Sequence, residues 1–134
     1  MAARYLTLSW DEFHRDARRL ANLAAKHGPY QGIVAVSRGG LIPAAILAHV
    51  LNIRLIECVS VAVYDQANTG PEETLTEPAI IKPPSAAAHG DGFLIVDDLV
   101  DTGIPASVIR GLLPKARFAC VYAKPAAVLL PTMW

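Results

Sequence analysis

Apolar and polar positions along the chain switch between a helical and a strand-like rhythm. From residue 10 to residue 24, apolar side chains recur every three or four positions, which predicts an amphipathic helix. Ser9 and Glu12 match a capping box at its start, and Gly28 and Pro29 end it. The other face carries the charged residues Arg15, Asp16, Arg18, Arg19 and Lys26. We expect this charged face to contact solvent.

Short apolar runs in the rest of the chain predict buried strands separated by helices. The strands are expected at residues 32–36, 53–63, 93–96 and 118–122, and the helices at residues 43–51 and 105–113. Because strands and helices alternate, the order favours a parallel sheet with right-handed crossovers. We therefore predict one α/β domain over residues 1–134, with an open, mostly parallel sheet flanked by helices.

Residues 64–91 interrupt this pattern, because they are polar and rich in Pro, Gly, Thr and Glu. A connection of this length in a compact domain usually serves as a lid or a binding loop, so we expect a flexible catalytic loop here. Residues 79–82 have enough apolar character for a short strand inside it.

The composition narrows the classes of protein. The chain has 134 residues, of which 53% are hydrophobic and 18% charged, which argues against disorder. Twelve basic residues balance twelve acidic ones, so the formal net charge is zero. This net charge does not predict a broad positive surface that would attract nucleic acid or an anionic membrane. A bound phosphate would have to be held by local geometry. The apolar content and zero net charge also favour self-association into a homo-oligomer.

Other signals point to an ordinary cytoplasmic protein. The longest apolar stretch is far shorter than the roughly 18 residues that span a bilayer, and the first residues do not resemble a secretory signal. Cys58 and Cys120 lie in apolar, strand-like runs, so we expect buried, reduced thiols. The sequence has neither a G-x-G-x-x-G nor a G-K-[ST] motif, which argues against dinucleotide-binding and P-loop enzymes.

Two segments follow predicted strands, where ligands bind in open α/β sheets. The first, residues 37–40, reads Ser-Arg-Gly-Gly and is called the glycine loop. Its glycines let backbone N–H groups approach an anion closely, and Arg38 can bind a phosphate with two hydrogen bonds. A tight turn between strand and helix is the alternative interpretation.

The second, residues 97–103, reads Asp-Asp-Leu-Val-Asp-Thr-Gly and is called the acidic segment. Three carboxylates in five residues repel one another unless a cation or a polyhydroxyl ligand relieves the repulsion. The segment leads into a helix N-terminus, which favours a phosphate. One stretch thus offers acceptors for hydroxyl groups and a metal, followed by donors for a phosphate, as ribose 5-phosphate requires.

These residues carry a resemblance to a known family. Residues 93–103 resemble the phosphoribosyl pyrophosphate motif of the type I phosphoribosyltransferases, and residues 34–43 resemble the pyrophosphate loop of the bacterial xanthine-guanine group. Residues 64–65, 124–126 and 10–11 also fit that group. The resemblance implies Mg²⁺-dependent transfer of a 5-phosphoribosyl group to guanine, xanthine or hypoxanthine. It further implies that the protein forms a dimer or tetramer. Peripheral association of the protein with a membrane is an expectation that rests on this resemblance alone.

The resemblance also implies roles for the donor-binding residues. Arg38 and Gly39 would hold the pyrophosphate of phosphoribosyl pyrophosphate. Asp97 and Asp98 would face the ribose hydroxyls, and Asp98 would also take part in binding Mg²⁺. The 5′-phosphate would be bound by Asp101, Thr102, Gly103, Ile104 and Pro105.

On the acceptor side, the resemblance assigns Asp101 to catalysis near N7 of the purine. Lys124 would bind the 6-oxo group, which separates these bases from adenine. Closure of residues 64–91 would exclude water.

The chain departs from the family pattern in three places. Ile104 and Pro105 stand where the family usually has glycine and threonine, which weakens the grip on the 5′-phosphate. The long loop contains acidic residues where relatives have basic ones. Residues 125–134 form an atypical apolar tail in place of the family's purine-covering hood, so we expect the hood to be reduced or missing, through truncation or a shifted reading frame. A non-catalytic or degenerate nucleotide-binding relative is therefore the alternative to an active enzyme.

Overall fold

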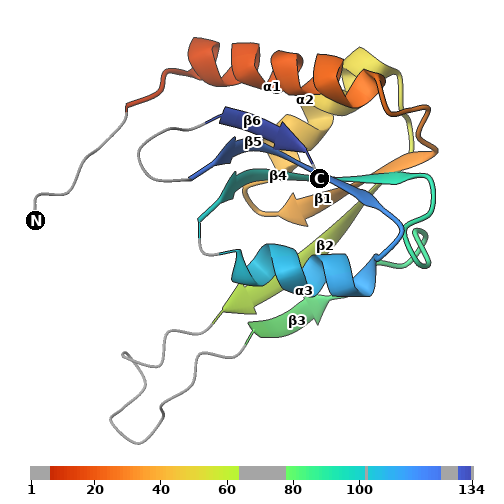
Figure 1. The fold of residues 1–134 in the computed structure, drawn as a ribbon. Helices are drawn as coiled ribbons and strands as arrows, with labels where there is room; N and C mark the ends of the chain where they lie inside the picture. The colour runs from red at the N-terminus through yellow and green to blue at the C-terminus, as the bar shows by residue number, and fades with distance from the viewer. Residues whose placement is uncertain (1–6, 64–77, 102, 125–129, 134) are drawn as a thin grey trace, which may run out of the picture.

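The computed structural model describes residues 7–63, 78–101, 103–124 and 130–133 (Figure 1). Its elements, in chain order, are α1 (Trp10–Ala25), β1 (Gly32–Ser37), α2 (Leu41–Leu51), β2 (Ile56–Val63), β3 (Pro78–Lys82), β4 (Phe93–Val100), α3 (Ile104–Leu112), β5 (Arg117–Ala123) and β6 (Leu130–Met133). All the predicted elements are present, with small shifts at their ends.

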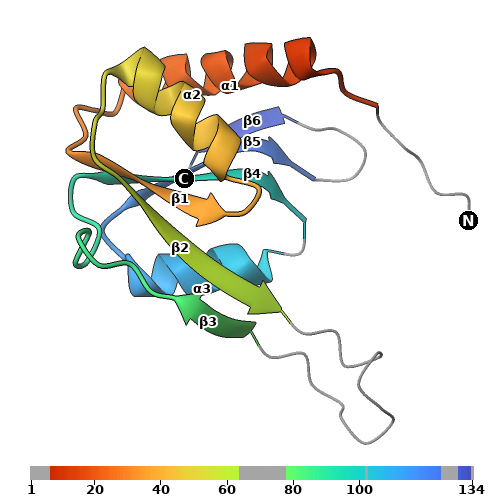
Figure 2. The ribbon, with the colours of Figure 1, turned by 180° about the vertical axis from the view of Figure 1, so that it is seen from behind.

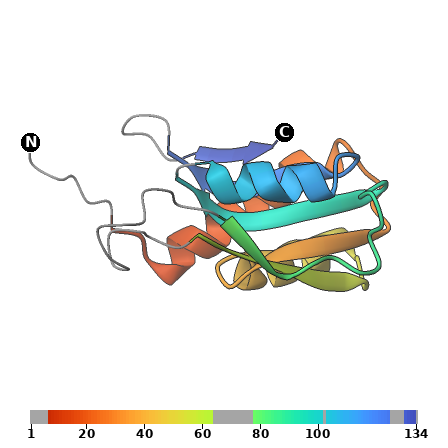
Figure 3. The same ribbon diagram turned by 90° about the horizontal axis from the view of Figure 1, so that it is seen from below.

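The strands form one sheet in the order β3-β2-β1-β4-β5-β6. The four central strands are parallel, whereas the edge strands β3 and β6 run antiparallel to their neighbours. Figures 1 and 2 show α1 and α2 on one face of the sheet and α3 on the other, and Figure 3 views the sheet from the α3 side. The predicted open, mostly parallel sheet is confirmed.

The core lies in two layers, one on each side of the sheet. Leu20 of α1 and Leu47 of α2 pack on the first side, and Ile109 of α3 packs on the second. Strand β1 contributes to both, since Ile33 and Val34 point to opposite sides and both are fully buried. A central parallel strand that is covered on both faces requires such a continuous apolar run.

Helix α1 begins as the sequence predicts but buries a residue expected in solvent. The Ser9 side chain accepts a hydrogen bond from the N–H of Glu12, and Glu12 bonds back to the Ser9 N–H, which completes the capping box. The prediction that Asp16 lies on a solvated face is wrong, because only 6% of Asp16 is exposed. Its carboxylate faces Tyr122 of β5, with which it forms a hydrogen bond.

The other differences concern strand ends and loops. Strand β3 confirms the short strand expected at residues 79–82, while residues 64–77 lie outside the described part of the chain. Strand β4 continues to Val100, four residues beyond its predicted end. Cys120 is buried as predicted, but Cys58 is only half-buried. None of the described helices is long and apolar enough to cross a membrane.

Candidate functional site

The glycine loop joins β1 to α2 and packs against the end of β4. The N–H of Gly40 donates to the carbonyl of Val36 at 2.7 Å. A Cβ atom on Gly40 would collide with the carbonyl oxygens of Val36 and Val96, which are backbone atoms and cannot move aside. Glycine is therefore required here by close approach to the backbone of β1 and β4.

The acidic segment meets the glycine loop at Gly39. A Cβ atom on Gly39 would come within 2.4 Å of both carboxylate oxygens of Asp98, so the Asp98 side chain lies directly over the Gly39 backbone. The Oδ1 atom of Asp98 also accepts the N–H of Leu99 at 2.7 Å. The two segments that the sequence singled out are thus in contact.

A cavity of about 360 Å³ opens at this contact. Its polar side is made by Arg38, Gly39 and Asp98. Its remaining lining residues are Leu8, Ser9, Trp10, Phe13 and Ile42. This largely apolar wall was not predicted from the sequence, since an amphipathic helix is expected to bury its apolar face, whereas 70% of Trp10 is exposed.

Asp97 lies in a different environment from its neighbour. Only 9% of Asp97 is exposed, and its Oδ1 atom accepts the N–H of Asp98 at 2.8 Å. Burial, together with the adjacent Asp98 carboxylate, raises the pKa of Asp97 to about 7. Asp97 therefore gives up its proton reluctantly unless a cation or hydroxyl groups replace the lost solvation.

A second, smaller cavity of about 110 Å³ lies beside Asp97. It is lined by Asp97, Leu99, Val100, Asp101, Gly103, Pro105 and Ala106. Asp97 and Asp98 thus border different cavities, because the alternation of β4 continues through them. Asp98 lies with the glycine loop, whereas Asp97 lies with the start of α3.

Helix α3 begins beside this smaller cavity. Gly103 is its N-cap, with a positive φ of 82° that glycine adopts without strain. Pro105 stands in the first turn, where a proline is compatible with the helix but supplies no N–H group. Ile104 is 42% exposed, and Thr102 lies outside the described residues. The N-terminal region of α3 thus adjoins the acidic segment, with fewer donors than a family-like sequence would offer.

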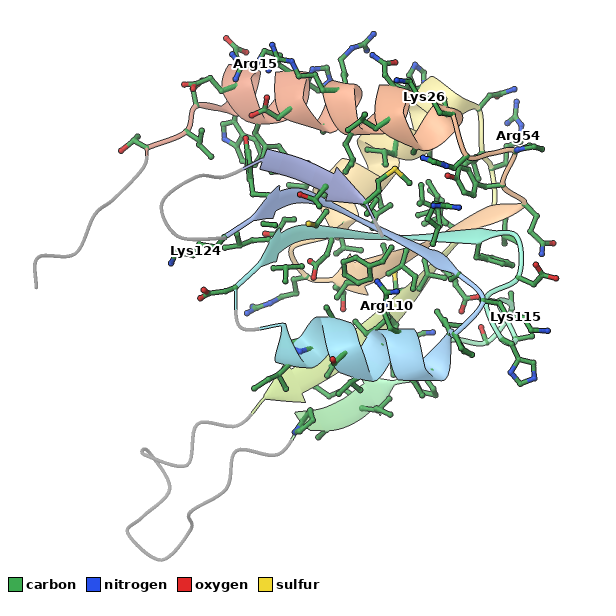
Figure 4. The ribbon with its side chains drawn as sticks, viewed as in Figure 1. Arg15, Lys26, Arg54, Arg110, Lys115 and Lys124 are labelled. Carbon is green, nitrogen blue, oxygen red and sulfur yellow. The ribbon has the colours of Figure 1, made fainter. Side chains whose placement is uncertain are left out.

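Lys124 completes the set of predicted site residues. It follows β5, and its Nζ atom lies 3.8 Å from Oδ1 of Asp101. Both side chains are more than half exposed, and the Lys124 N–H donates to the carbonyl of Val100 at 3.2 Å. Figure 4 shows Lys124 at the edge of the sheet where the central strands end.

Two further contacts, which the sequence did not predict, lie behind the site. The hydroxyls of Ser37 and Ser60 lie 2.5 Å apart and join the end of β1 to the middle of β2 just before Arg38. The hydroxyl of Tyr122 donates to Asp16 at 2.6 Å. Neither pair leaves a signal in the local sequence, since the partners are 23 and 106 residues apart.

The described residues do not include a cluster of three or more His, Cys, Asp or Glu side chains able to hold a metal on their own. Asp97 and Asp98 nevertheless offer carboxylate oxygens, the ligands that Mg²⁺ prefers. Because Mg²⁺ is often bound by one or two carboxylates together with substrate phosphates, the Asp98 carboxylate, which borders the larger cavity with Arg38, fits a metal that arrives with its substrate.

The chain is similar to known proteins over most of its length. The phosphoribosyl transferase domain matches residues 9–134. The chain is 61% identical over 122 residues to a xanthine-guanine phosphoribosyltransferase of Gluconobacter oxydans, which covers 90% of this chain and 70% of that protein. The corresponding enzyme of Idiomarina loihiensis is 47% identical, with 90% and 72% covered. A purine phosphoribosyltransferase structure from Pyrococcus horikoshii gives a TM-score of 0.75 at 29% identity, covering 94% of this chain and 82% of that one. The chain belongs to the phosphoribosyltransferase family.

Proposed function

We propose that this protein is a purine-salvage enzyme that transfers the 5-phosphoribosyl group of phosphoribosyl pyrophosphate to a 6-oxopurine. The products are a nucleoside 5′-monophosphate and pyrophosphate. The observation that carries the proposal is the joining of two segments: Asp98 lies on Gly39, and Asp101 faces Lys124. Groups suited to an anionic donor and to a purine acceptor therefore share one edge of the sheet. The names of the relatives from Gluconobacter oxydans and Idiomarina loihiensis support guanine and xanthine as acceptors.

In this proposal, the larger cavity takes the pyrophosphate end of the donor. The Arg38 guanidinium can hold phosphate oxygens with two parallel hydrogen bonds. Gly39 has no side chain, so its backbone can approach the anion closely. A side chain at this position would also collide with Asp98. As the bond to the ribose breaks, negative charge grows on the pyrophosphate, and Arg38 stabilises that charge in the transition state.

Asp97 and Asp98 would bind the ribose hydroxyls from the two sides of the strand end, and Asp98 would also bind Mg²⁺. When bound, Mg²⁺ neutralises charge on the departing pyrophosphate. The raised pKa of Asp97 fits a carboxyl that becomes an effective acceptor only when ligand groups replace its lost solvation. Both carboxylates would also stabilise the positive charge that develops on the ribose ring.

The acceptor purine would be bound by Lys124 and Asp101. The Lys124 ammonium donates to the 6-oxo oxygen, which adenine lacks. Asp101 would accept the hydrogen bond or the proton at N7 while the opposite ring nitrogen attacks the ribose. Both side chains are more than half exposed, so the two charged groups are accessible at the protein surface although they lie 3.8 Å apart.

The smaller cavity would take the 5′-phosphate, with Asp101, Thr102, Gly103, Ile104 and Pro105 around it. Its closeness to the positive end of the α3 dipole favours an anion. Pro105 removes one donor from this turn, so we expect weaker donor binding than a threonine would give. Residues 64–91 would act as the flexible loop that excludes water, and a cytoplasmic homo-oligomer is the expected form.

A spectrophotometric assay tests the proposal. The full chain is incubated with phosphoribosyl pyrophosphate, Mg²⁺ and guanine, xanthine, hypoxanthine or adenine in turn. We expect nucleotide formation with at least one 6-oxopurine, loss of the activity with EDTA, and no product with adenine. Binding of the nucleotide without turnover at high protein concentration would instead support the non-catalytic alternative.

A further inference from the structure

A buried hydrogen bond ties helix α1 to the strand that presents Lys124. The Tyr122 hydroxyl donates to Oδ2 of Asp16 at 2.6 Å, and each residue is only 6% exposed. The other oxygen, Oδ1, is 3.2 Å from Nε of Arg15 and 3.5 Å from the guanidinium of Arg19. Both oxygens of Asp16 are therefore partnered.

The charge state of Asp16 makes this contact strong. Although burial alone would raise the pKa of Asp16, the hydrogen bonds from Tyr122 and Arg15 hold it below its ordinary value. Burial and the Asp16 carboxylate raise the pKa of Tyr122, so the hydroxyl keeps its proton and remains the donor. A hydrogen bond from a neutral donor to a buried carboxylate is among the stronger ones in proteins.

The hydrogen bond between Tyr122 and Asp16 lies where β5 lacks regular pairing with β6. The register between β5 and β6 shifts between Cys120 and Ala123, and Tyr122 lies within that shift. Lys124 follows only two residues later. On its other side β5 stays paired with β4 through Tyr122 and Ala123, and the Lys124 N–H donates to the carbonyl of Val100. On the β6 side, where regular pairing is interrupted, the Tyr122 side chain adds a contact between the end of β5 and α1.

The same residues connect to the larger cavity. The rings of Phe13 and Tyr122 pack edge to face with their centroids 6.1 Å apart. The rings of Trp10 and Phe13 pack in the same way, with their centroids 5.9 Å apart. Trp10 and Phe13 line the cavity that also contains Arg38. The start of α1 therefore contacts both the cavity and the strand end that precedes Lys124.

We propose that Tyr122 and Asp16 are positioning residues that set the place of Lys124 for recognition of the purine. The proposal rests on the role given to Lys124 above. Neither residue touches the substrate; the pair acts through the backbone of β5. Loss of the Tyr122 hydroxyl lets the strand end shift, so Lys124 no longer meets the 6-oxo group in one geometry. The effect falls on binding of the base more than on binding of phosphoribosyl pyrophosphate.

The chain offers a matched control for the tyrosine. The Tyr30 hydroxyl donates to the carbonyl of Ala24 at 2.7 Å, at the opposite end of α1. Tyr30→Phe removes a similar hydrogen bond to the same helix, away from Lys124. Both variants are expected to lower the melting temperature, so only a readout that separates base binding from stability tests the positioning role.

The experiment compares Tyr122→Phe, Asp16→Asn, Asp16→Ala and Tyr30→Phe with the wild-type chain. Steady-state kinetics give KM for the 6-oxopurine and for phosphoribosyl pyrophosphate, and calorimetry gives Kd for the nucleoside monophosphate. We expect Tyr122→Phe and Asp16→Ala to raise KM for the base and Kd for the nucleotide about tenfold, the worth of one strong hydrogen bond. KM for the donor should change less than about twofold. Asp16→Asn keeps an acceptor for Tyr122 and should recover most of the affinity.

The outcomes separate the inference from the function on which it depends. A lower melting temperature with unchanged KM and Kd in Tyr122→Phe would overturn the positioning role. An equal rise of KM in Tyr30→Phe would overturn it as well, since a general loosening of α1 would then explain the effect. A Lys124→Gln variant that binds base and nucleotide as the wild type does would remove the proposed role of Lys124 itself. If Lys124→Gln is impaired and Tyr122→Phe is not, only the inference fails.

Discussion

Gly39 lies directly beneath the carboxylate of Asp98, with no room for a Cβ atom between them. This contact joins two segments that are 59 positions apart in the sequence. Asp98 can therefore stay where it is only if residue 39 is glycine. The contact also places Asp98 and Arg38 around one cavity.

Gly39→Ala is expected to displace Asp98 and abolish most of the activity. The new methyl group would lie only 2.4 Å from the carboxylate oxygens, so either the loop or Asp98 must move. We expect KM for phosphoribosyl pyrophosphate to rise at least about tenfold, as misplacement of a binding group by about an ångström implies. Initial-rate kinetics with varied donor measure this effect.

Gly111→Ala is the matched control. Gly111 lies in α3, and a Cβ atom there would meet no other atom within 4 Å. Since alanine favours a helix over glycine, this variant should gain about 0.5–1 kcal/mol of unfolding free energy and keep its kinetics. Equal donor KM values in Gly39→Ala and the wild type would contradict the close contact.

The buried carboxyl of Asp97 predicts a pH dependence of stability. Its pKa is about 7 in the folded chain, against an ordinary value of 3.8, so the folded state keeps a proton that the unfolded state loses between these values. The contribution of Asp97 to stability is therefore complete below about pH 4 and is lost as the pH rises towards 7. Three pKa units correspond to roughly 4 kcal/mol at most.

Urea unfolding at several pH values in EDTA, with wild type and Asp97→Asn, isolates this contribution. The asparagine variant cannot ionise, so the wild type should lose stability relative to it between about pH 4 and pH 7. Above that range the difference should level off. A difference that stays constant across the range would show that Asp97 ionises normally in the folded chain.

Much of this architecture follows from local patterns, while the site required long-range contacts. Ser9 and Glu12 define the start of α1 because a capping box lies within four residues. The sequence put the end of β4 before Asp97 and Asp98, so it did not show that their side chains lie on opposite sides of the strand. In the folded chain β4 runs through both, so they border different cavities. When carboxylates follow an apolar run, the sequence does not show at which residue the hydrogen bonding to the neighbouring strands ends.

Asp16 shows the other limit of local reasoning. Its neighbours Arg15, Arg18 and Arg19 are charged, so it was grouped with the polar face, although its spacing from Leu20 puts it at the border of the apolar face. The partner that makes its burial favourable, Tyr122, is 106 residues away. A buried charge is tolerated only when it is partnered, and a single sequence does not identify the partner. For the same reason, the pair Ser37 and Ser60 was not predicted.

The two cysteines should differ in reactivity. Burial, with the nearby carboxylates of Asp97 and Asp98, raises the pKa of Cys120 to about 12, and the side chain is fully buried in the core. Cys58 is half-buried in β2. Because the thiolate is the reactive form, iodoacetamide at pH 8 should label Cys58 first and Cys120 only after unfolding. Peptide mass mapping checks this, and rapid labelling of Cys120 in the native chain would contradict its burial.

Lys124→Gln should weaken recognition of the base without weakening the fold. The Lys124 side chain is 54% exposed and lies 3.8 Å from an exposed Asp101, and a surface ion pair of this kind contributes less than about 1 kcal/mol to stability. The melting temperature should therefore stay within a few degrees of the wild-type value. Loss of a charged donor to the 6-oxo oxygen should raise KM for guanine or xanthine about tenfold to a hundredfold, while KM for phosphoribosyl pyrophosphate changes little.

Lys115→Gln is the control for loss of one positive charge. Lys115 is exposed and lies at the opposite end of the strands from Lys124 (Figure 4), so this variant should leave both KM values unchanged. Equal KM values for the base in Lys124→Gln and Lys115→Gln would show that the purine is recognised elsewhere.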